Sequence, residues 1–156
     1  SVSGITTLSS GEPLSLRPMF NNTGGLVDAL RVNIVPGVNP AVSNRGPDQW
    51  FNPAAFLLPA AGTYGNAGRG ILTGPGLATV DASLLKSFAI GERIKSQFRA
   101  EFFNIFNHPM LNNPATTLTS GTYGRITQTL ANAGATQGDI TSGGPRIIQL
   151  ALKVTF

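Results

Sequence analysis

The sequence contains no cysteine and one histidine, His108. The absence of cysteine excludes a disulfide framework. A lone histidine leaves neither a zinc site nor a histidine-based catalytic triad. The seven acidic residues show no EF-hand spacing. We therefore expect no metal, no cofactor and no enzymatic activity.

Charge is also scarce. Charged residues make up 12% of the 156 residues, whereas a soluble domain usually has about 25%. No basic run with interleaved aromatic residues indicates nucleic-acid binding, and no apolar run reaches the about 18 residues of a transmembrane helix. The chain is instead rich in Gly (19), Pro (11), Asn, Ser and Thr, which favours strands joined by polar loops over helices.

The clearest unit in the sequence is "TVDASLLKSFAIGERIKSQFRAEFFNIFNHP". In its second half, polar side chains occupy the odd positions and apolar or small ones the even positions. Alternation with period two over ten residues is typical of a strand. The first half alternates as well, although Lys86 interrupts its apolar row. The pattern predicts a hairpin of two strands near 79–90 and 93–106, with a short turn at Gly91-Glu92.

The two ends of the sequence predict two more strands. "PRIIQLALKVTF" is apolar at every even position from Ile148 to Phe156, which predicts a strand near 146–156. "SVSGITTLSSGEPLSL" is a weaker strand near 1–16. The intervening segments, near 17–78 and 107–145, are full of Gly, Pro and Asn and are interpreted as long loops. Both contain "GTYG", which we interpret as shared turn chemistry and not as a repeat.

The order of these connections is long loop, short turn, long loop. Membrane barrels have short turns on the periplasmic side and long loops on the extracellular side. If Phe156 ends on the periplasmic side, every connection falls on the side that its length requires. We therefore expect an all-β fold, in which antiparallel strands with long loops form the last four or so strands of a transmembrane β-barrel. A soluble antiparallel sheet with one wet face alternates identically and is the alternative.

In a barrel, the apolar row of each strand faces outer-membrane lipid and the polar row faces the lumen. The predicted lumen-facing residues are Arg93, Lys95, Gln97, Arg99 and Glu101. Asp81 and Glu101 are expected to pair with Lys or Arg across strands. Four aromatic residues of the predicted loops are candidate ligand contacts, for example by stacking on a sugar: Trp50, Phe51, Tyr64 and Tyr123. The alternative is that they pack the loops against themselves.

Four strands cannot close a barrel, since the smallest have about eight, and lipid does not tolerate an open sheet edge. The sequence opens on Ser1 without a leader. We therefore expect either a fragment of a larger protein or a chain that pairs its edges with other chains. The second case describes a self-associating structural chain, with an extracellular location, that builds fibres or oligomers by strand-edge pairing.

Five motifs follow one another along the chain in this order: "RVNIVPGVNP", "QWFNPAAF", "VDASLLKSF", "FRAEFFNIFNHP" and "PRIIQLALKVTF". Together they resemble the C-terminal end of TonB-dependent outer-membrane receptors, in particular the acidobacterial type with a carboxypeptidase-regulatory-like N-terminal domain. The resemblance implies a bacterial outer-membrane barrel that imports a bulky nutrient with energy from TonB. It also implies that this chain works with the rest of the barrel and an N-terminal plug. His108 would have a structural role in the "FNHP" turn.

The same resemblance implies that the last strand carries a signal for the barrel-assembly machinery. The signal has a polar residue, a small residue two positions later, and hydrophobic residues at the third-last and last positions. The matching residues are Gln149, Ala151, Val154 and Phe156. Ala stands where Gly is usual and Val where an aromatic residue is common. Recognition of such a strand by its edge is a form of β-augmentation.

Overall fold

The computed structural model describes residues 1–21, 23–24, 30–90, 93–130 and 144–156. The regular structure in these ranges is β-strand, apart from one short 3-10 turn, Pro53–Ala55, so the predicted all-β class is confirmed. No helix in these ranges is long and apolar enough to cross a membrane. The chain forms two compact units, described separately below. The sheet unit comprises Ser1–Ser10, Gly76–Met110 and Thr129–Phe156, and the loop unit comprises Gly11–Pro75 and Leu111–Gln128.

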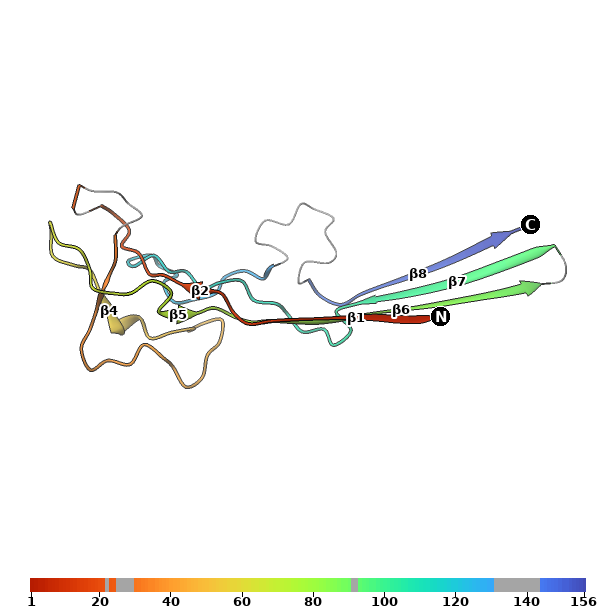
Figure 1. Cartoon of the computed structure of the whole chain (residues 1–156), viewed down its shortest axis with the longest axis horizontal. Coiled ribbons are helices and arrows are strands. Elements are labelled where there is room, and N and C mark those ends of the chain that lie inside the picture. Colours follow the sequence, from red (N-terminus) through yellow and green to blue (C-terminus); the bar gives the residue numbers. More distant parts are fainter. Residues whose placement is uncertain (22, 25–29, 91–92, 131–143) are drawn as a thin grey trace. The chain divides into compact units, whose positions relative to one another are not determined.

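The sheet unit is built on four antiparallel strands, which lie side by side in the order β1-β6-β7-β8 (Figure 1). Their bounds are Val2–Ser9 for β1, Leu77–Ile90 for β6, Ile94–Phe103 for β7 and Ile147–Thr155 for β8. In this register Val2 lies opposite Leu84, Leu84 opposite Ala100, and Ala100 opposite Leu150. Opposed residues of an antiparallel sheet point to the same face, so the even-numbered residues of all four strands share one face.

Three of these strands lie close to the predicted ranges, but the first is shorter than expected. The predicted strand near 1–16 ends at Ser9, and Pro13–Leu14 (β2) pairs instead with Leu72–Thr73 (β5) in the loop unit. Proline lacks the N–H that would continue the ladder. The predicted turn at Gly91-Glu92 lies outside the described residues, and the backbones of Ile90 and Ile94 pair on either side of it.

The direction of the strands follows the predicted order of connections. Thr155, the last residue of β8, lies opposite Lys95 at the start of β7, so β8 ends at the same end of the sheet as the β6–β7 connection (Figure 1). The long connections after β1 and β7 leave from the opposite end. Within the described ranges, β1 and β8 each have one unpaired edge, so the sheet is open.

The loop unit has a core of its own, which the composition of its sequence did not predict. The buried residues that form this core are Leu14, Leu16, Val32, Phe51, Ala55, Phe56, Ala67, Leu72 and Leu118. Two short strand pairs cross the unit: β2 with β5, and Asn33–Ile34 (β3) with Phe56–Leu57 (β4). The predicted long loop is therefore a packed body, because small apolar clusters between its turns collect around one centre.

Asparagine side chains supply many of the hydrogen bonds that regular structure would otherwise provide in the loop unit. The Asn66 Oδ1 atom accepts from the Ile34 N–H (2.8 Å), and the Asn33 Oδ1 atom accepts from the Asn66 N–H (3.1 Å). Asn52 caps the 3-10 turn by accepting from the Ala54 N–H (3.1 Å). These side chains thus satisfy backbone N–H groups that have no strand partner, which accounts for part of the Asn-rich composition.

Candidate functional site

One face of the sheet is apolar and exposed. It carries the even-numbered residues of the strands, and its exposed members are Val2, Leu8, Leu84, Phe88, Ile94, Ile148, Leu150, Leu152 and Val154. Their exposed fractions range from 38% for Ile94 to 78% for Val2. Monomeric soluble proteins rarely expose large contiguous apolar patches. This face, which we call the apolar face, is suited to contact with lipid hydrocarbon.

Small residues and one cation interrupt the apolar face. Ser96 and Ala100 of β7 are buried on it, and Lys86 of β6 lies opposite Phe98. A lysine on a lipid-facing surface keeps its stem in apolar surroundings and extends its ammonium group toward the interface. Lys86 lies four residues before the end of β6 at Ile90, so the nearest interface is the one at the β6–β7 connection.

The opposite face of the sheet, here called the polar face, carries the odd-numbered residues. Its polar members are Ser3, Thr7, Ser9, Thr79, Asp81, Ser83, Ser87, Lys95, Gln97, Arg99, Glu101, Gln149, Lys153 and Thr155. The predicted lumen-facing residues Lys95, Gln97, Arg99 and Glu101 all lie in this set. Arg93 precedes the first residue of β7 and occupies the turn. The apolar residues on this face are Ile5, Leu77, Leu85, Ala89, Phe103, Ile147 and Ala151.

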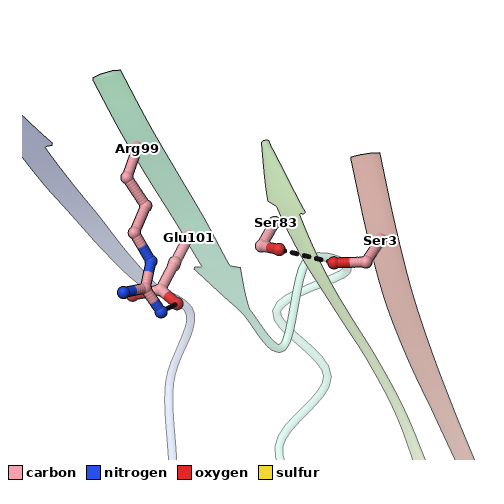
Figure 2. Close-up of polar contacts among 4 residues, drawn as sticks. All are labelled: Ser3, Ser83, Arg99 and Glu101. Carbon is pink, nitrogen blue, oxygen red and sulfur yellow. Dashed lines mark hydrogen bonds and ion pairs between the residues drawn. The ribbon is translucent and has the colours of Figure 1, made fainter. Parts of the chain in front are cut away.

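The polar face is linked by side-chain contacts both across strands and within a strand. The Ser3 and Ser83 hydroxyls are hydrogen-bonded at 2.7 Å between β1 and β6, and Arg99 Nη2 contacts Glu101 Oε1 at 2.6 Å within β7 (Figure 2). Gln97 Nε2 donates to Ser87 Oγ at 3.5 Å. All three contacts join exposed polar side chains.

The predicted cross-strand ion pairs of Asp81 and Glu101 are wrong. Glu101 lies opposite Ser83 and Gln149, so the register brings no cation to it from a neighbouring strand, and it pairs with Arg99 two positions away. Asp81 lies opposite Ile5 and accepts a hydrogen bond from the backbone N–H of Asn104 (2.8 Å). The register of the sheet, which the sequence pattern did not specify, decides both outcomes.

Asn104 organises the end of β7 and was not singled out by the sequence pattern. Its side chain is 6% exposed, and its φ of 49° is left-handed, a conformation that Asn adopts more readily than most residues. Its Nδ2 donates to the carbonyls of His108 and Gly144, each at 2.9 Å, and its Oδ1 accepts from the His108 N–H at 3.1 Å. Asn104 thus ties β7 to the segment that enters β8. The sequence feature that could have indicated this role is the pair of asparagines, Asn104 and Asn107, in "FFNIFNHP".

Of the candidate ligand-contact aromatics, Phe51 is part of the core. It is 1% exposed, and its ring makes edge contacts with Phe56 (5.9 Å between centroids) and Tyr123 (5.1 Å). The structure therefore gives Phe51 a packing role, and the prediction of a ligand contact is wrong for it. Tyr64 is 60% exposed and stays a candidate contact.

Trp50 and Tyr123 are partly buried beside the same core. Trp50 Nε1 donates to the Thr73 carbonyl (2.8 Å), and the Arg45 guanidinium lies 5.8 Å from the centroid of its ring, within the range of a cation–π contact. The Tyr123 hydroxyl is buried without a hydrogen-bond partner among the described residues. Burial raises the pKa of this hydroxyl. Both side chains contribute to packing, and a ligand role for them remains a prediction.

The predicted assembly signal falls on β8 and the residue that follows it. Gln149 and Ala151 lie on the polar face, Val154 lies on the apolar face, and Phe156 follows the strand. One edge of β8 is unpaired within the described ranges. The strand therefore presents an edge to which another strand can be added, while the signal itself stays a prediction.

The described residues contain no group of three or more His, Cys, Asp or Glu side chains that would hold a metal ion. Among known families, the model for "Outer membrane beta barrel domain" matches residues 1–149. No curated protein and no solved structure matches the chain. The family match covers all four strands of the sheet except the last part of β8.

Proposed function

The chain belongs to the outer membrane beta barrel domain family and is located in the bacterial outer membrane, and from this premise we propose that it forms the last strands of a TonB-dependent receptor. In this proposal the complete receptor imports a bulky nutrient, and this chain supplies part of the barrel wall and two of its extracellular connections. The barrel-assembly machinery inserts it through the signal at the end of β8.

The observation that carries the proposal is the arrangement of the connections. Both long connections leave the sheet at one end, and β6 joins β7 by a few residues at the other. Short turns on one side and long loops on the other are common to outer-membrane barrels, so it is the packing of the long segments that matters here. Here most of the two long segments forms a packed unit with its own hydrophobic core, which supports a role in capturing a ligand outside the cell.

In this proposal the two faces of the sheet have different roles. The apolar face, with residues such as Leu84 and Leu150, contacts lipid. The polar face, with Lys95, Arg99 and Glu101, lines the lumen through which a hydrophilic nutrient passes. The remaining barrel strands would pair with the edges of β1 and β8, since lipid does not tolerate open edges.

The test uses the full-length product of the gene, purified from outer membranes in detergent. A folded barrel migrates differently on gels before and after heating, and this property selects the folded protein. We expect that this material binds the purified periplasmic domain of TonB in a pull-down experiment. A folded barrel that does not bind TonB would refute the receptor proposal and leave the family assignment intact.

A second candidate function rests on the unpaired edges of β1 and β8. Copies of the chain would associate edge to edge and build a fibre or an oligomer. Light scattering of the isolated 156-residue chain in detergent micelles, which cover the apolar face, distinguishes the two, because an assembly that still forms there supports self-association through the strand edges. A monomer under those conditions speaks against it.

A further inference from the structure

Lys86 of β6 is the one charged residue on the apolar face of the described strands. The other even-numbered residues of these strands are apolar, glycine, alanine, serine or threonine. Lys86 is exposed, and it forms no ion pair with any residue that the structure describes. An ammonium group that leaves water without a counter-charge is costly. The described part of the sheet therefore does not supply the counter-charge of Lys86.

The acidic residues of the described strands lie on the other face. Asp81 and Glu101 belong to the polar face, where Asp81 accepts from the Asn104 N–H and Glu101 pairs with Arg99. Glu92 lies outside the described residues, six positions after Lys86 in the sequence. The experiment below therefore varies Glu92 as well as Lys86.

The position of Lys86 along β6 places it near one edge of the hydrocarbon layer. The middle of this 14-residue strand falls at Ser83 and Leu84. From Leu84, two residues correspond to about 5 Å along the membrane normal at a typical barrel tilt, which leaves about 7 Å to the edge of an apolar band about 25 Å tall. An extended lysine side chain covers most of this distance. The edge is the one at the β6–β7 connection, where β8 also ends (Figure 1).

The residues around Lys86 form a surface suited to acyl chains. Phe98 lies opposite Lys86 on β7, and Leu152, which is 65% exposed, continues the same row on β8. Phe88, two residues further along β6, is also exposed. Ser96 lies opposite Phe88 and diagonal to Lys86, and its small side chain leaves room for the lysine stem to lie along the sheet.

An ammonium group beside exposed apolar side chains, at the edge of the hydrocarbon layer, is complementary to the head of a phospholipid. The phosphate of such a lipid is anionic and lies at that edge, and its acyl chains continue into the layer. Hydrogen bonds from an ammonium group to phosphate are charge-assisted and stronger than neutral ones. We propose that Lys86 binds the phosphate of a phospholipid in the periplasmic leaflet, whose acyl chains lie against Phe98 and Leu152. The proposal depends on the barrel fold and its orientation, and it does not depend on the import of a nutrient.

The test is native mass spectrometry of the full-length protein in detergent, which resolves individual bound lipids. The probes are phosphatidylglycerol, diacylglycerol with the same acyl chains but no phosphate, and lipid A, whose phosphates belong to the opposite leaflet. We expect phosphatidylglycerol to bind more tightly than diacylglycerol. Lys86→Gln should weaken phosphatidylglycerol at least about fivefold, because a charge-assisted interaction is lost, and Lys86→Arg should retain most of the affinity. The matched control, Lys153→Gln, removes the same charge from the polar face of β8 and should leave the affinity unchanged.

Several results would overturn the proposal. An unchanged affinity in Lys86→Gln would exclude the contact, and an equal loss in Lys153→Gln would show diffuse attraction to cations. An equal loss for diacylglycerol would show that the phosphate is not recognised, and an equal loss for lipid A would contradict the periplasmic leaflet. If the effect of Lys86→Gln disappeared in a Glu92→Gln background, Lys86 would act through Glu92 and not on the lipid. Heat-modifiable migration verifies that each variant is folded, and the assay contains no TonB, so its failure is distinguishable from a failure of the receptor proposal.

Discussion

The assignment of the two faces can be tested at the centre of β6, where Ser83 and Leu84 are neighbours. This strand has 14 residues, which corresponds to about 45 Å of extended chain and about 34 Å along the membrane normal at a typical barrel tilt. Ser83 and Leu84 therefore lie near the middle of the apolar band, which is about 25 Å tall. Leu84 lies on the apolar face and Ser83 on the polar face. Leu84→Arg and Ser83→Arg place the same side chain at the same depth but on opposite faces.

The expected magnitudes differ because only one arginine meets lipid. Arg on the lipid face near the midplane costs about 2–4 kcal/mol of folding free energy. Ser83→Arg loses the hydrogen bond with Ser3, which contributes about 1 kcal/mol. It also places a cation opposite Glu101, and this exposed ion pair stabilises the folded state by less than about 1 kcal/mol. The two variants should therefore differ by roughly 1–4 kcal/mol, or about 5- to 700-fold in the folding equilibrium.

The assay is urea unfolding of the full-length protein in lipid vesicles, followed by tryptophan fluorescence and by heat-modifiable migration. The variant Leu84→Arg should shift the unfolding midpoint to lower urea, and Ser83→Arg should stay near the wild type. Equal destabilisation by both variants, or a larger effect of Ser83→Arg, would refute the assignment of the apolar face to lipid.

Three further predictions follow from individual contacts. Asn104→Ala removes a buried side chain that makes three hydrogen bonds and should cost about 2–4 kcal/mol in urea unfolding, whereas a cost below about 1 kcal/mol would contradict its structural role. Tyr123→Phe should leave stability at neutral pH unchanged or higher, because the hydroxyl has no described partner. Burial raises the pKa of the Tyr123 hydroxyl, so this hydroxyl ionises at a lower pH in the unfolded chain than in the folded chain. The wild type therefore loses stability as the pH rises above about 10, and the variant should lack this loss. Deletion of Phe156 should lower the fraction of heat-modifiable protein in outer membranes without changing the ligand affinity of the assembled molecules, and unchanged assembly would contradict the signal.

The alternation of side chains was sufficient to predict the sheet. In "RIKSQFRAEFF" every second residue points to the same face, so the apolar and polar faces follow from the local pattern. The lengths of the segments between the strands then predicted the strand directions. Both inferences depend only on the pattern within each strand and on the lengths of the connections, and for that reason they needed no knowledge of tertiary contacts.

The core of the loop unit depends on contacts that no local pattern encodes. Leu16, Val32 and Leu118 are far apart in the sequence, and they share one core because the chain between them folds back on itself. In the same way, the sequence predicted a ligand contact for Phe51, whereas the structure buries its side chain in the core. The sequence by itself determined the strands and the character of their two faces, since these follow from period-two alternation. Only the tertiary structure decided which loop residues are buried and which polar groups Asn104 holds together, because these depend on packing between distant segments.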